Sequence, residues 1–126
     1  WGLFAEKYGT PERFFTEHFV ANYCPLLFLE SSGKNRTPDK LSKTERERIF
    51  ASCDEHLRRM VEILTPEFAV GIGRFAENRL NEALSRPGFD HIRVLSILHP
   101  SPANPRANRD WAGEVTRALK ANGIWR

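Results

Sequence analysis

A run of prolines directly after an apolar stretch is the feature that most constrains the fold of this chain. Residues 94–98 are mostly apolar, and three prolines follow between positions 100 and 105. Proline lacks a backbone N–H and fixes φ, so it cannot continue the hydrogen-bond ladder of a strand. The pattern predicts a strand that ends abruptly near Leu98, then a stiff loop, then a helix that begins near Asn104 or Asn108.

Helices and strands alternate along the rest of the chain. Ser42 and Glu45 fit a capping box, and apolar residues then recur every three or four positions as far as Pro66, which predicts one long helix. Thr10 and Pro11 predict a helix that runs to about residue 17. A further helix is expected over about residues 74–84, a final one that stops at Gly123, a polar loop over residues 30–42, and strands over residues 19–23, 68–73 and 91–98.

Strands that are separated by helical crossovers predict an α/β fold with a mostly parallel central sheet flanked by helices. Three strands make a thin sheet for such a fold, and the chain does not begin with Met. We therefore expect residues 1–126 to form a partial domain that lacks the first strand of its sheet.

Composition narrows the class of protein. Only two cysteines are present, at positions 24 and 53, which argues against a disulfide scaffold or a metal cluster and favours an intracellular protein. No apolar run approaches the length of a membrane span. Residues 31–60 carry eight Lys or Arg against five Asp or Glu, and residues 99–126 carry five against two. Such clustered positive charge fits a polyanionic partner, although solvated helix faces would give similar counts.

Polar side chains follow the ends of the predicted strands, where α/β sheets bind their ligands. His99 follows the third strand, and Asn22 lies at the end of the first, although a bond to its own backbone is an alternative for Asn22. After the second strand, Gly73 and Arg74 open a helix whose N-terminus favours an anion, although glycine in such turns often serves packing alone.

Four motifs in this order resemble the single-strand-selective monofunctional uracil-DNA glycosylases, within the uracil-DNA glycosylase superfamily. The motifs are FVANYCPL (residues 19–26), SGKNRTP (32–38), VGIGRFAE (70–77) and HPSP (99–102) with the NP and AN pairs that follow. The resemblance covers nearly the whole chain. It implies the superfamily's parallel sheet between helices, and removal of uracil or a 5-substituted uracil from DNA by base flipping.

The resemblance also implies roles for single residues. His99 would be the catalytic residue that stabilises the leaving base, and Asn22 would recognise uracil through its amide. The implied DNA contacts are made by Lys34, Arg36, Gly73, Arg74, Pro100, Ser101, Pro102, Ala103 and Asn104. For Lys34 and Arg36, a solvated loop is an equal alternative. No metal or other cofactor is implied, the partner is uracil-containing DNA, single- or double-stranded, and the complete protein is expected to be a monomer.

The chain departs from the family pattern in two places. No stretch matches the family's Gly-Met-Asn-Pro-Gly-type loop, which positions the attacking water, and a base-stacking aromatic belongs to the same missing region. Ala103 stands where some relatives carry a bulkier or basic residue in the loop that wedges into DNA. A non-enzymatic nucleic-acid-binding α/β module is therefore the alternative function, and a purely structural fragment is a third possibility.

Overall fold

Two parallel strands lie at the centre of the structure. A computed structural model describes residues 1–126, apart from the side chain of Asp39. Strand β1 (Phe68–Ile72) pairs with β2 (Arg93–Ile97) in a register that places Ile72 opposite Ile97. The other elements are α1 (Gly2–Tyr8), α2 (Pro11–Phe15), the 3-10 helix η1 (Pro38–Lys40), α3 (Lys43–Leu64), α4 (Arg74–Leu84) and α5 (Pro105–Ala121).

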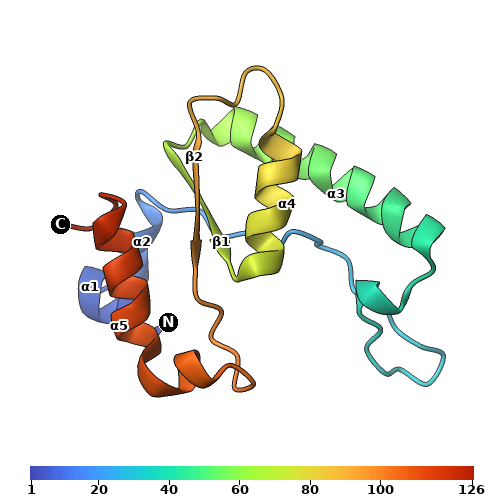
Figure 1. The fold of residues 1–126 in the computed structure, drawn as a ribbon, viewed down its shortest axis with the longest axis horizontal. Helices are drawn as coiled ribbons and strands as arrows, with labels where there is room; N and C mark the ends of the chain where they lie inside the picture. Colours follow the sequence, from blue (N-terminus) through green and yellow to red (C-terminus); the bar gives the residue numbers. More distant parts are fainter.

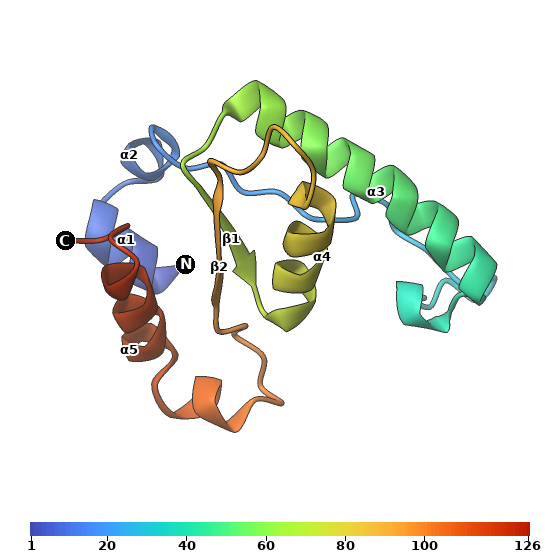
Figure 2. The same ribbon diagram turned by 45° about the horizontal axis from the view of Figure 1, so that its top comes forward.

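Helices cover both faces of this sheet, so the α/β fold that the sequence predicts is confirmed. Figures 1 and 2 show α4 and α3 on one side of the strands and α5 with α1 on the other. The alternation of side chains along a strand sends neighbours to opposite faces. Ala69 accordingly packs in a cluster with Val61, Leu80, Leu84, Phe89 and Ile92. Leu95 and Ile97 pack in a second cluster with Val115, Leu119 and Trp125.

The helix-start signals in the sequence correspond to observed caps. The Ser42 hydroxyl accepts a hydrogen bond from the Glu45 N–H, and the Glu45 carboxylate accepts one from the Ser42 N–H. The hydrogen bonds from Ser42 hold the pKa of Glu45 below its usual value. The predicted limits of α4 are also those observed, and α5 stops just before Gly123, which has a φ of +75°.

The predicted strand over residues 19–23 is wrong, and the sheet has two strands where three were expected. Residues 18–28 have no regular structure. The side chains of Phe19 and Val20 are exposed (64% and 46%), so the apolar pattern that suggested a strand is not buried by sheet pairing. Figure 2 shows this segment running past α4 toward the start of α3. The helix predicted to reach residue 17 ends at Phe15, and α1 was not predicted.

One close contact fixes how α4 lies on the sheet. Gly71 in β1 is buried, and a Cβ atom added there would come within 2.5 Å of the Glu77 backbone nitrogen and 2.9 Å of the Ala76 carbonyl carbon. Only glycine lets the helix backbone approach the strand this closely.

We therefore expect Gly71→Ala to destabilise the fold by about 1–3 kcal/mol, because the methyl group meets backbone that cannot rotate away. Chemical denaturation measures this change. Gly2→Ala is the control, since a Cβ atom at Gly2 meets nothing within 4 Å. Equal stability of the two variants would contradict the close-contact explanation.

Candidate functional site

The ends of the two strands bring Gly73 and His99 into contact. Because β1 and β2 are parallel, the residues that follow them emerge at the same edge of the sheet. The Gly73 N–H donates a hydrogen bond to the Ile97 carbonyl (2.9 Å). A Cβ atom added to Gly73 would lie 3.0 Å from the His99 Cβ and 3.5 Å from its Cδ2. The imidazole of His99 is therefore an exposed group that packs against a glycine turn.

Gly73 also turns the chain from β1 into α4. Its φ of +89° lies in the region that L side chains rarely adopt, and its carbonyl accepts from the Glu77 N–H (3.1 Å). The N-terminus of α4 thus begins beside His99 with backbone N–H groups that no side chain caps. Such a helix start favours an anion such as a phosphate.

The proline loop after His99 is ordered by its own hydrogen bonds. The Ser101 N–H donates to the His99 carbonyl (2.8 Å), and the Asn104 N–H donates to the Ser101 carbonyl (2.9 Å). The Ser101 hydroxyl accepts from the Ala103 N–H (3.3 Å). These hydrogen bonds give the loop a defined shape. They engage the N–H, the carbonyl and the hydroxyl oxygen of Ser101 within the loop.

Helix α5 anchors this loop from the other side. The Asn104 side-chain oxygen caps the helix by accepting from the Arg106 N–H (3.0 Å), and its side-chain NH₂ has no partner among the described residues. The Asn108 side chain donates to the Pro102 carbonyl (2.7 Å), and the Trp111 indole donates to the Leu98 carbonyl (2.6 Å). The anchoring by Asn108 and Trp111 was not predicted from the sequence, because it depends on how the helix folds back onto the loop.

Asn22 lies in the irregular segment that passes α4, and its side chain is exposed. The next residue is Tyr23, and the centre of its ring lies 5.7 Å from the centre of the Phe75 ring. Phe75 follows Gly73 by two positions. The segment that carries Asn22 therefore passes beside the start of α4. Among the hydrogen bonds of the described residues, none joins Asn22 to His99 or to Gly73.

The structure separates Lys34 and Arg36 from the sheet edge. Figures 1 and 2 show their loop beside the start of α3, with α4 between it and the strands. Arg36 is engaged within this loop, where it donates to the Lys40 carbonyl (3.1 Å) and lies 3.6 Å from a carboxylate oxygen of Glu30. Any contribution of these two residues to ligand binding is thus remote from His99.

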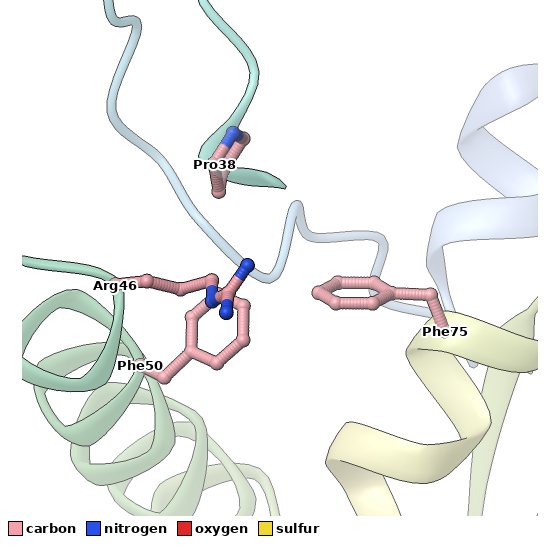
Figure 3. A pocket seen from close by; sticks show the side chains of 4 residues that line it. All are labelled: Pro38, Arg46, Phe50 and Phe75. Carbon is pink, nitrogen blue, oxygen red and sulfur yellow. The ribbon is translucent and has the colours of Figure 1, made fainter. Parts of the chain in front are cut away.

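An apolar hollow of about 430 Å³ lies between this loop and α4, and it was not predicted from the sequence. It is lined by Pro38, Arg46, Phe50 and Phe75, and Figure 3 shows the side chains that come from α3 and α4 facing one another across it. Phe75 is 55% exposed. The hollow could not be identified from the sequence, because its lining residues come from three separate elements, η1, α3 and α4, that only the tertiary structure brings together.

The described side chains include no group of three or more His, Cys, Asp or Glu arranged to hold a metal ion. Cys53 is buried, and burial together with a hydrogen bond to Cys24 raises its pKa to about 11, so its thiol stays protonated near neutral pH. Among the helices of the described residues, none combines the length and apolar character that a membrane crossing requires.

Comparison with known proteins assigns the fold to a family. The sequence model of the Uracil DNA glycosylase superfamily matches residues 3–120. The chain belongs to this superfamily. It is similar to single-strand selective monofunctional uracil DNA glycosylases, with 41% identity to the protein of Bos taurus over 124 residues and 42% to that of Rattus norvegicus over 125. These alignments cover 98% of this chain but 45% and 44% of the two relatives, so the chain spans less than half of their length. The family resemblance that the motifs predicted is confirmed.

The contact between Gly73 and His99 can be tested by adding one methyl group. We expect Gly73→Ala to displace the His99 ring, because the new Cβ atom would lie 3.0 Å from the His99 Cβ. The imidazole signals of His99 in NMR spectra should shift. Gly123→Ala is the matched control, since Gly123 also has a positive φ (+75°) but has no neighbour within 4 Å of an added Cβ atom. Unchanged His99 signals in Gly73→Ala would contradict the contact.

Proposed function

We propose that residues 1–126 form part of one uracil-DNA glycosylase-like domain, in a protein that hydrolyses the N-glycosidic bond of uracil or a 5-substituted uracil in DNA. The observation that carries this proposal is the packing of His99 on Gly73 at the carboxyl edge of the strands, in a chain of this superfamily. A nucleotide flipped out of the DNA stack would present its base to this edge.

The reaction explains why a donor such as His99 is needed. Cleavage of the bond between sugar C1′ and base N1 leaves an oxocarbenium-like sugar and a uracil anion. Negative charge develops on the base carbonyls, and a donor that is already in position at O2 stabilises the transition state. The backbone on both sides of His99 is held by hydrogen bonds from the Gly73 and Ser101 N–H groups, so the imidazole starts from a defined backbone position.

Asn22 is the residue that we assign to base recognition. One amide can donate to uracil O4 and accept from N3–H at the same time. Cytosine presents an amino group at C4 and an unprotonated N3, so the same amide orientation would leave both partners unsatisfied. The passage of the Asn22 segment beside α4 supports this assignment.

The DNA backbone would be bound around the same edge. We assign phosphate contacts to the start of α4 at Gly73 and Arg74, and contacts near the flipped nucleotide to residues 100–104 of the proline loop. Lys34 and Arg36 would form a separate basic patch that contacts the DNA strand farther from the flipped nucleotide. These contacts need no metal and no other cofactor.

We infer that the group that positions the attacking water lies outside residues 1–126, because no stretch of them matches the corresponding family motif. His99 stabilises the leaving base but does not activate water. Stabilisation of the leaving base and positioning of the water would then be encoded in different parts of the polypeptide. Residues 1–126 alone should therefore excise uracil more slowly than the full-length protein.

A glycosylase assay on uracil-containing single-stranded DNA tests this division. In the full-length protein, His99→Ala should lower the excision rate by about 10²–10³-fold, because the developing charge loses its donor. The 126-residue chain alone should be slower than the full-length protein by about 10²–10⁴-fold, the usual contribution of a water-orienting group.

The control for this assay is His91→Ala, which removes an exposed histidine in the turn before β2 and should leave the rate unchanged. Full activity of the 126-residue chain, abolished by His99→Ala, would show that the water-positioning group lies within these residues. Full-length protein that binds DNA without excising uracil would favour the non-enzymatic alternative.

Asn22→Asp tests base recognition separately. An ionised carboxylate cannot donate to O4, so excision of uracil should fall and the preference for uracil over cytosine should weaken or reverse. Competition between oligonucleotides that carry each base measures the preference. Asn81→Asp makes the same chemical change at an exposed position of α4 and should have no effect. An unchanged uracil rate in Asn22→Asp would remove Asn22 from this role.

A further inference from the structure

Tyr23 attaches the segment that carries Asn22 to two helices. Its hydroxyl donates a hydrogen bond to Asp54 Oδ1 on α3 (2.6 Å) and accepts one from Arg79 Nε on α4 (3.1 Å). The Tyr23 ring also makes an edge contact with the Phe75 ring at 5.7 Å. One side chain thus connects the segment to both helices on this face of the sheet.

The partners of Tyr23 are themselves held in place. Arg79 forms an ion pair with Asp54 (2.5 Å), and both side chains are largely buried, with 14% and 16% exposed. The Arg79 guanidinium also lies 4.8 Å from the centre of the Phe50 ring. Burial and the hydrogen bond to Asp54 raise the pKa of Tyr23 above its usual value, so its hydroxyl keeps the proton that it donates.

The rest of the segment has few such contacts. Among residues 19–27, only Tyr23 and Cys24 are half-buried, and the other side chains are exposed. Without strand pairing, the backbone of Asn22 has no ladder of hydrogen bonds to define its position. The adjacent Tyr23 is therefore the nearest fixed point from which the Asn22 amide can be oriented.

We propose that Tyr23 is a positioning residue that holds Asn22 for base recognition through its hydrogen bonds with Asp54 and Arg79. This inference rests on the role of Asn22 in the proposed function. An amide distinguishes uracil from cytosine only when its oxygen and nitrogen are held in one orientation, and a displacement of about 1 Å weakens such recognition. Tyr23 does not touch the substrate and acts through Asn22 alone.

A double-mutant cycle in the full-length protein tests this proposal. Tyr23→Phe removes the hydroxyl and keeps the ring. It should lower kcat/KM for uracil in single-stranded DNA by about threefold to tenfold, the range expected for loss of such a hydrogen bond. In an Asn22→Ala background, the same change should alter kcat/KM by less than about twofold, because the residue through which Tyr23 acts is absent.

Tyr8→Phe is the matched control, since Tyr8 is the only other tyrosine of the chain. Its hydroxyl also bonds two side chains, Trp125 (3.0 Å) and His18 (3.2 Å), but on the opposite side of the sheet. Tyr8→Phe should leave kcat/KM unchanged in both backgrounds. Amide hydrogen exchange should become faster over residues 20–24 in Tyr23→Phe and stay unchanged there in Tyr8→Phe.

Equal effects of Tyr23→Phe in the two backgrounds would overturn the proposal, as would a loss of thermal stability without any change in kcat/KM. Failure of the proposed function would look different, because the unmodified full-length protein would then excise no uracil. In that case, the positioning role in base recognition would be wrong as well, and faster exchange over residues 20–24 would show only that Tyr23 anchors the segment.

Discussion

The backbone of α4 lies so close to β1 at Gly71 that an added Cβ atom would come within 2.5 Å of the Glu77 nitrogen. This approach determines where the helix begins, and therefore where Gly73 turns the chain with a φ of +89°. His99 packs directly against that turn. The position of the imidazole thus follows from two glycines that let strand, turn and helix meet without intervening side chains.

A two-stranded sheet has little stability of its own, so the helices on its two faces must supply most of the buried surface. The clusters around Ala69 and Leu95 provide it on opposite sides. The second cluster also reaches the site, because Trp111 packs against it and donates a hydrogen bond to the Leu98 carbonyl. Core packing and the shape of the proline loop are therefore coupled through one indole ring.

Local signals predicted much of this structure because they depend on neighbouring residues. The residues that start or end a helix lie within a few positions of that boundary. This holds for the capping box at Ser42, the limits of α4 and the helix start at Asn104. The stretch over residues 19–23 was predicted wrongly because its apolar pattern allows a strand, whereas the choice depends on a partner strand. In the structure, the Tyr23 hydroxyl instead forms hydrogen bonds with Asp54 and Arg79, which lie 31 and 56 positions away in the sequence.

The sequence by itself determined the order of the elements from α3 onward, the abrupt end of β2 before the prolines, and the four motifs that reveal the family. Those features rest on backbone stereochemistry, on hydrophobic periodicity and on residue identity. Only the tertiary structure decided that His99 packs on Gly73, that Asn108 and Trp111 shape the proline loop, and that Tyr23 anchors the segment of Asn22. Each of these contacts joins atoms from separate elements, and their distances depend on how closely the helices and strands pack.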